Sequence, residues 1–202
     1  MKTVEPIKDV KIIKSMRTFL KGQSTRNELL FIFGINVGLR VSDILNLKFS
    51  DVVESPYVVK DYVTIKEQKT GKTKKFYLGD LVKKLIKNYI SEIKDFSLDL
   101  YVFRSRKGPN KKISRQQAYN ILNDAAEKIG IVKRDKDKGH IVSGEIGTHT
   151  LRKTFGYFAC KNGSSLELLM QIFNHSSQAQ TLHYIGLTEE QKKAVYLKSN
   201  LG

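Results

Sequence analysis

The amino-acid sequence predicts an α+β fold that is mainly helical and contains one small antiparallel β-sheet. Most segments place apolar residues three and four positions apart, the spacing of a helix with one buried face. One stretch, 57–78, is instead rich in the β-branched and aromatic residues that favour strands. The chain has 202 residues, a length that suits one compact domain, and we expect 1–202 to fold as a single unit.

The first fifty residues are expected to be helical. Apolar residues recur at helical spacing in 10–20, and 27–39 (NELLFIFGINVGL) continues as a strongly apolar segment. A short helix should follow in 41–52 (VSDILNLKFSDV). Ser42 or Asp43 is its expected N-cap, because a short polar side chain can accept a hydrogen bond from the first helical turn.

A β-hairpin is the expected structure of 57–78. The strand-forming sequences YVVKDYVTIKEQ and KKFYLG flank KTGK, in which Gly71 supplies turn geometry. Helical spacing returns in 80–94. The sequence VFRSRKGPNKK, at 102–112, predicts a short strand that runs into a basic loop.

The second half of the chain is again expected to be helical. A helix is predicted at 114–129, where Ser114 and Gln117 have the spacing of a capping box. The segment 133–147 is expected to be a loop with some extended structure. Glycine, asparagine and serine residues divide 149–198 into four helical pieces.

The charge balance is strongly basic. Lysine and arginine number 36 against 20 acidic residues, which gives a formal net charge of +16. A field of this sign attracts polyanions, because each neutralised phosphate releases condensed counterions. A surface of solvated lysines, or a basic protein that binds RNA, would show the same balance, so charge alone favours nucleic acid without choosing its kind.

The sequence is that expected of a soluble cytoplasmic protein. Cys160 is the one cysteine, which excludes an intrachain disulfide and favours a reducing compartment. The first twenty residues lack the apolar core of a signal peptide, and no later run approaches the roughly 18 apolar residues of a membrane-spanning helix. No membrane association is expected.

Four motifs follow one another along the chain: GLRVSDILNLKFSDV, KTGK, HTLRKTF and NHSSQAQTLHYIG. In this order and at this spacing they resemble the tyrosine recombinase (phage integrase) family, and the resemblance covers about 6–196. It implies a recombinase catalytic domain that cleaves double-stranded DNA, forms a 3′-phosphotyrosyl intermediate and rejoins DNA through a 5′-hydroxyl. Integration or excision of a mobile element, encoded by a bacterium or a phage, is the implied role.

The resemblance also assigns roles to individual residues. It implies that a tyrosine attacks the DNA and that arginines, a lysine and histidines surround the scissile phosphate. Asp43 lies where the family often has an acidic residue that supports the first arginine. The positions implied to be catalytic are Arg40, Lys69, His149, Arg152, His175 and Tyr184.

Phosphoryl transfer gives chemical reasons for these residue types. Negative charge grows on the nonbridging phosphate oxygens in the transition state, and the guanidinium groups of Arg40 and Arg152 could bind them in bidentate fashion. His149 precedes Arg152 by three positions, so both should lie on one helix face. Because the arginines supply positive charge, no metal and no cofactor is expected, and activity should survive EDTA.

Proton transfer would use the remaining groups. Lys69, placed by the match to KTG, is the expected general acid for the leaving oxygen, and Lys72 is the second candidate. Several lysines share the hairpin, and a lysine-rich turn is often only a soluble surface. A tyrosine hydroxyl has a pKa near 10, so Tyr184 needs a base, a role open to His149. His175 is expected to donate a hydrogen bond to a phosphate oxygen.

The basic loop before residue 114 and the helix at 114–129 allow two interpretations. A solvated basic edge would need no partner, whereas the net charge and the resemblance favour contact with double-stranded DNA. In the second interpretation the start of the helix enters a groove and the loop binds phosphates. The residues expected to contact DNA are Lys72, Arg104, Arg106, Lys111, Lys112, Arg115, Gln116 and Tyr119.

Domain content and assembly are further implications of the resemblance. Members usually carry an N-terminal core-binding domain, and Met1 lies near the start of the matching region, so we expect that domain to be absent. The family implies a homo-oligomer on DNA, in the form of a tetrameric synapse, and the sequence is compatible with a free monomer. Lys153, Asn174 and Gly186 depart from the usual motifs and leave the subfamily open.

Three other functions fit parts of the sequence. A noncatalytic DNA-binding regulator could share the fold, although all six implied catalytic positions are intact. A type IB topoisomerase would use similar tyrosine chemistry and relax DNA without sequence preference. A basic RNA-binding protein would explain the charge but not the ordered histidine, arginine and tyrosine residues.

Overall fold

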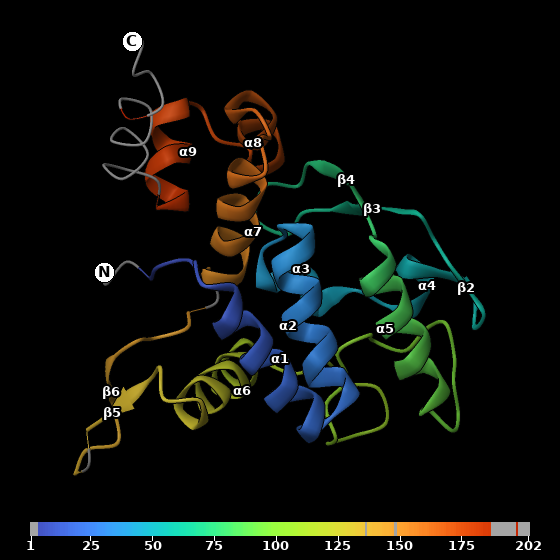
Figure 1. Ribbon diagram of the computed structural model, residues 1–202. Coiled ribbons are helices and arrows are strands. Elements are labelled where there is room, and N and C mark those ends of the chain that lie inside the picture. The colour runs from blue at the N-terminus through green and yellow to red at the C-terminus, as the bar shows by residue number, and fades with distance from the viewer. Residues whose placement is uncertain (1–3, 136, 148, 187–196, 198–202) are drawn as a thin grey trace.

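The computed structural model describes residues 4–135, 137–147 and 149–186, together with residue 197. Within this part of the chain helices predominate, as the sequence predicts (Figure 1). The helices are α1 Val10–Gln23, α2 Thr25–Val37, α3 Val41–Asn46, α4 Phe49–Val52, α5 Asp80–Ser91, α6 Arg115–Lys128, α7 Thr150–Lys161, α8 Leu166–Phe173 and α9 Gln178–Ile185. The strands are β1 Val53–Ser55, β2 Val58–Val59, β3 Tyr62–Lys66, β4 Thr73–Tyr77, β5 Lys133–Arg134 and β6 Ile141–Ser143.

The strands form three separate two-stranded antiparallel sheets, β1–β2, β3–β4 and β5–β6. The expectation of one small sheet was therefore too simple, although the α+β class is confirmed. The predicted hairpin at 57–78 is divided between two sheets. Its first strand, β2, pairs with the preceding β1, and the hairpin proper consists of β3 and β4. The strand predicted in 102–112 is reduced to an isolated bridge between Arg104 and Lys112.

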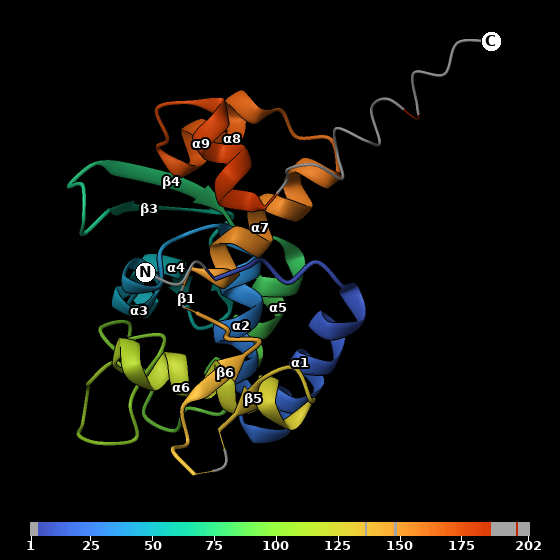
Figure 2. The same cartoon turned by 90° about the vertical axis from the view of Figure 1, so that its left-hand side faces the viewer.

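Helix α2 lies at the centre of the fold and packs against α1, α5 and α7 (Figures 1 and 2). Its sequence is apolar around most of its circumference, which is the pattern of a helix buried on all sides. Gly34 allows α7 to approach closely, since a Cβ there would lie 2.4 Å from Leu151 Cδ1. We call the continuous apolar interior around this helix the α2 core; Leu30, Phe31 and Phe33 lie fully inside it.

A much smaller apolar cluster lies beneath α9. Its fully buried members are Leu169, Phe173 and Ile185, and partly buried residues of α7, including Phe155, surround them. Gly156 allows α7 to approach this cluster closely, because a Cβ there would lie 2.5 Å from Ile185 Cγ2. We call this unit the α8–α9 cluster.

Of the two helix starts predicted from local sequence, one was confirmed and one was wrong. Ser114 caps α6, and its side chain accepts a hydrogen bond from the Gln117 amide. The N-cap expected for the short helix was wrong, since Arg40 precedes α3 and makes no side-chain capping bond. Asp43, one of the expected caps, is used in a tertiary contact with the Gln68 amide instead.

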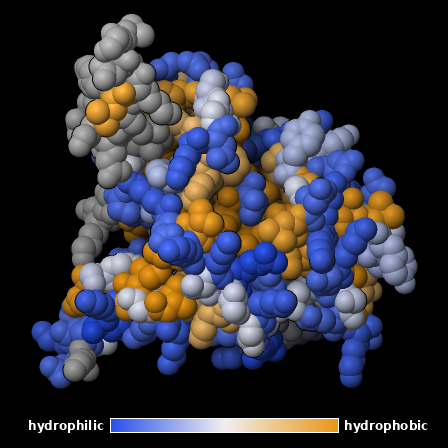
Figure 3. Space-filling view, in the orientation of Figure 1, coloured by the Kyte–Doolittle hydropathy of each residue, from blue (hydrophilic) through white to orange (hydrophobic). Residues whose placement is uncertain are grey.

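The outer surface is mixed in character, with apolar patches among hydrophilic side chains on the face in Figure 3. No helix in the described part of the chain is long and apolar enough to cross a membrane. The last helical piece expected from the sequence, 187–198, lies outside the described residues except for Leu197.

Candidate active site

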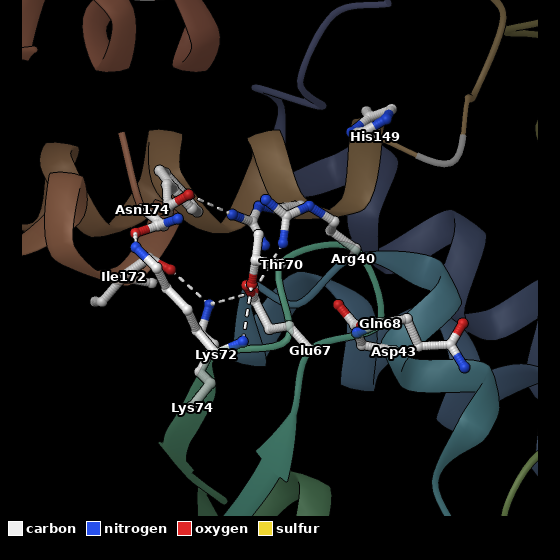
Figure 4. A network of polar contacts seen from close by, with 12 residues as sticks. Arg40, Asp43, Glu67, Gln68, Thr70, Lys72, Lys74, His149, Ile172 and Asn174 are labelled. Carbon is white, nitrogen blue, oxygen red and sulfur yellow. Dashed lines mark hydrogen bonds and ion pairs between the residues drawn. The ribbon is translucent and has the colours of Figure 1, made fainter. Parts of the chain in front are cut away.

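Arg40 stands where the chain enters α3 in an extended conformation, and its guanidinium points toward the turn between β3 and β4 (Figure 4). Arg40 Nη1 donates a hydrogen bond of 2.8 Å to Glu67 Oε1. Asp43 Oδ1 accepts from the Gln68 amide at 3.0 Å, which fixes the same end of the hairpin. Asp43 therefore fixes the start of the hairpin turn, next to Glu67, the partner of Arg40.

Arg152 is the most deeply buried of the six candidate groups, with 2% of its surface exposed. Its position on α7 places Nη2 2.9 Å from the Phe173 carbonyl, and the guanidinium lies 4.9 Å from the Phe173 ring centroid. Arg152 Nη1 is buried without a hydrogen-bond partner within the described residues. Burial lowers the pKa of Arg152, while the nearby Tyr184 acts in the opposite direction.

Tyr184 projects from α9 into the same region. Its hydroxyl lies 3.3 Å from His149 Nδ1, and its ring packs 5.4 Å from the Phe173 ring and 5.0 Å from the His175 ring. Burial raises the pKa of Tyr184, and the positive charges of Arg152 and Arg40 partly offset that rise. The tyrosine hydroxyl thus lies beside a histidine and within the influence of both arginine charges.

The surroundings of His149 and His175 favour the neutral form of each imidazole. His149 occupies the N-cap position of α7, and His175 follows the end of α8, with Nδ1 3.0 Å from Thr181 Oγ1. Burial, followed by the charge of Arg152, lowers the pKa of each imidazole. At neutral pH the ring of His149 can accept a proton from the tyrosine hydroxyl.

The lysines of the β3–β4 hairpin divide into two kinds. Lys69 lies in the turn and lines an open hollow together with Arg40, Arg115 and His149. Lys74 points inward from β4; its Nζ lies 3.9 Å from Glu67 Oε1, and its side chain is 13% exposed. Burial, followed by Arg152, lowers the pKa of Lys74 to about 8.

Glu67 and Lys74 are site residues that the sequence reasoning missed. Strand alternation contained the signal, because Lys74 shares one face of β4 with the buried Phe76 and precedes it by two positions. Pairing of Lys74 with Ile65 across the hairpin completes that inward face. Glu67 gives no comparable pattern, because it follows the end of β3.

Most of the expected DNA contacts lie near α6 and the loop that precedes it. In Figure 2 the β3–β4 hairpin, α3 and α6 lie along one side of the molecule. Some of these side chains have partners within the protein: the Tyr119 hydroxyl donates to Glu145 at 3.0 Å, Arg104 donates to the Pro109 carbonyl, and Gln116 donates to Asn120. Lys112 donates to Asn46, and Lys72 donates to Asn174 at 3.3 Å. Arg115 joins the hollow at Arg40.

Sequence comparison finds relatives over nearly the whole chain. The chain is 38% identical over 196 residues to the probable integrase/recombinase YoeC of Bacillus subtilis (strain 168), and the match covers 97% of each protein. It is 25% identical over 189 residues to the tyrosine recombinase XerA of Pyrococcus furiosus. In that case the match covers 94% of this chain and 60% of the relative.

Structure comparison and a family model agree with these relatives. The crystal structure of XerA recombinase matches all of this chain and 67% of that one, with a TM-score of 0.74 and 20% identity. The XerH recombinase in a post-cleavage complex with a palindromic difH substrate matches 97% of this chain and 53% of that one, with a TM-score of 0.70 and 18% identity. These likenesses show the fold. Because the model of the phage integrase family matches residues 7–191 and a relative at 38% identity spans the chain, the protein belongs to the phage integrase family.

Proposed function

We propose that this protein breaks and rejoins double-stranded DNA with Tyr184 as the nucleophile. The tyrosine oxygen bonds to a backbone phosphorus, the bond from that phosphorus to the 5′-oxygen breaks, and the leaving oxygen takes a proton. The product is a 3′-phosphotyrosyl link and a free 5′-hydroxyl. Attack by the 5′-hydroxyl of another strand reverses these bond changes and returns the tyrosine. Family membership, the contact of the Tyr184 hydroxyl with His149 and the nearby charge of Arg152 support this proposal.

The observation that carries the proposal is the buried Nη1 of Arg152, which has no hydrogen-bond partner among the residues that the structure describes. A buried donor without a partner costs about 1–3 kcal/mol, and more when it is charged. A phosphate oxygen at this position would accept the missing hydrogen bond, and charge-assisted bonds of this kind are stronger than neutral ones. Arg40 lies in the same region and would neutralise the second nonbridging oxygen.

The other side chains have roles that follow from their positions. His149 takes the proton of the Tyr184 hydroxyl, because their atoms are 3.3 Å apart and the lowered pKa keeps the imidazole neutral. Lys69 gives a proton to the leaving 5′-oxygen from the hollow that it shares with Arg40. His175 donates a hydrogen bond to a phosphate oxygen. Neither a metal nor a cofactor enters these steps.

Integration or excision of a mobile element is the biological role that we propose. One relative carries the name integrase/recombinase, and another is the probable integrase/recombinase of Acholeplasma phage L2, 27% identical over 168 residues. Strand exchange requires two duplexes to be cut and joined, so we expect several copies of the chain to act together on DNA. The basic hollow beside α6 and the net charge of +16 suit such a partner.

A covalent trapping experiment tests the chemistry. Nicked duplexes with randomised arms, incubated with protein in EDTA, should give a protein–DNA adduct on a denaturing gel, because the fragment beyond the nick dissociates after cleavage. Tyr184→Phe should abolish the adduct and retain DNA binding, whereas Tyr157→Phe, on α7, should leave both unchanged. An adduct that persists in Tyr184→Phe would rule out this tyrosine as the nucleophile.

A further inference from the structure

Glu67 is a buried carboxylate that receives hydrogen bonds from two directions at the base of the hairpin turn (Figure 4). Its surface is 3% exposed. Oε1 accepts from Arg40 Nη1 at 2.8 Å, and Oε2 accepts from Thr70 Oγ1 at 2.7 Å. Lys74 Nζ lies 3.9 Å from Oε1 as a second cation. A buried carboxylate with this set of partners has little freedom to rotate.

The hairpin also holds the end of α8. The Lys74 ammonium donates a hydrogen bond to the Ile172 carbonyl, and Lys72 Nζ donates to Asn174 Oδ1 at 3.3 Å. Arg152 Nη2 donates to the next carbonyl, that of Phe173, at 2.9 Å. Cationic side chains therefore bind the carbonyls that α8 leaves unsatisfied at its C-terminus, where the helix dipole also favours positive charge.

The end of α8 leads directly to the proposed nucleophile. Asn174 adopts a left-handed conformation with φ of 55°, turns the chain, and is followed by His175 and then by α9 with Tyr184. A change in where α8 ends would therefore move both His175 and the tyrosine. The hairpin side chains contact this corner on one side and Arg40 on the other.

We infer that Glu67 and Lys74 are positioning residues that set the phosphate-binding Arg40 and the tyrosine-bearing corner relative to each other through one buried ion network. Glu67 holds one edge of the Arg40 guanidinium, and Lys74 joins Glu67 to the end of α8. A guanidinium has five N–H donors, so Glu67 can orient it while the remaining donors stay available to a phosphate. This inference rests on the function proposed above.

The charges around Glu67 explain why its replacement by a neutral residue should slow the reaction. Arg40 and Arg152 both depress the pKa of Lys74, and Glu67 is the first counter-charge that raises it. Without the carboxylate, three cations would face one another in a partly desolvated space, and Arg40 would lose its fixed partner. A displacement of about 1 Å in such a group can slow a reaction about 100-fold.

Glu67→Gln tests the first half of the network. With a nicked substrate at saturating DNA, we expect the single-turnover cleavage rate to fall about 10- to 100-fold while the DNA dissociation constant changes less than about threefold. Glu54→Gln, at an exposed carboxylate of β1, is the matched control and should cleave at the wild-type rate. In an Arg40→Lys background, Glu67→Gln should add less than about a threefold effect, because its partner is already displaced.

The outcomes separate this inference from the proposed function. If the wild-type protein forms no adduct at Tyr184, the proposed function fails before the variants are compared. If the wild type cleaves and Glu67→Gln cleaves equally fast, only the positioning role is overturned. The same holds if Glu67→Gln loses DNA affinity and thermal stability in parallel with cleavage, because that pattern indicates general destabilisation.

Lys74 needs a test that distinguishes positioning from proton donation. Lys74→Met should slow cleavage about 10-fold or more, Lys74→Arg should restore much of the rate, and Lys75→Met, at the exposed neighbour, should have no effect. A substrate with sulfur as the 5′-bridging atom releases a thiolate, whose conjugate acid has a pKa of about 8.5, and needs no proton donor. It should rescue Lys69→Ala but not Lys74→Met. Rescue of Lys74→Met would overturn the positioning role and make Lys74 the acid.

Discussion

The α2 core and the α8–α9 cluster differ in how much apolar surface holds them together. The α2 core joins side chains from most of the helices, whereas the α8–α9 cluster has Leu169, Phe173 and Ile185 as its fully buried members. Arg40 and Arg152 stand on elements that pack into the first region, and Tyr184 stands on the second. The proposed phosphate-binding arginines are thus anchored where we expect stability to be highest, and the proposed nucleophile lies where local opening should cost least.

Phe33→Ala should have the largest effect, because it removes a side chain from the middle of the α2 core. The Phe33 ring is fully buried and meets the rings of Phe76 and Phe103 edge to face. We expect a loss of about 3–5 kcal/mol in the free energy of unfolding, measured by urea denaturation, with both regions unfolding together. Tyr57→Ala, at an 84% exposed site, should change stability by no more than about 0.5 kcal/mol.

Leu169→Ala should act on the α8–α9 cluster alone. A buried leucine truncated to alanine costs about 2–5 kcal/mol, and the lower end is expected in a small cluster that can collapse around the gap. Hydrogen exchange should accelerate in α8 and α9 while α2 amides keep their protection. Leu168→Ala, at a neighbouring side chain that is 50% exposed, serves as the control. Equal acceleration in α2 would show that the two regions unfold as one.

Acidification should produce the smallest effect on stability, and we expect that effect in the α8–α9 cluster and not in the α2 core. Burial, followed by the charge of Arg152, lowers the pKa values of His149 and His175. The unfolded chain then binds more protons than the folded one at these two sites. Their contribution to stability is therefore fully present above about pH 6.5 and decreases as the pH falls below it. Hydrogen exchange at pH values from 7.5 to 5.5, corrected for intrinsic rates, should reveal faster opening of α9 than of α2. A His149→Gln, His175→Gln double variant should lose this difference.

The candidate catalytic positions that could be predicted from sequence are those carried by recognisable motifs. Arg40, His149, Arg152, His175 and Tyr184 were named from their sequence context, and the structure brings them to one region. Their individual roles stay predictions. Helix locations were also predictable, because apolar periodicity depends on neighbours within a few turns.

Contacts between distant segments explain what could not be predicted. Asp43 is a residue type that often caps helices, yet its carboxylate binds the Gln68 amide 25 residues away. The 57–78 segment does not form one long hairpin because β2 pairs with β1, which lies outside that segment. Lys74 could not be singled out among the hairpin lysines from sequence. Its inward direction depends on the register of β3 and β4, and its partner Ile172 lies 98 residues further along the chain.

The hydrogen bond between Lys74 and Ile172 has a consequence for the order in which the protein is made. Ribosomes add about 5–20 residues per second, and N-terminal elements can fold first. Most of the α2 core is synthesised before α8 emerges, whereas the contact across 98 residues must wait for it. Long-range contacts of this kind form late in folding. A nascent chain can therefore assemble most of the α2 core before it contains Tyr184, so the proposed nucleophile joins the fold only after the elements that hold Arg40.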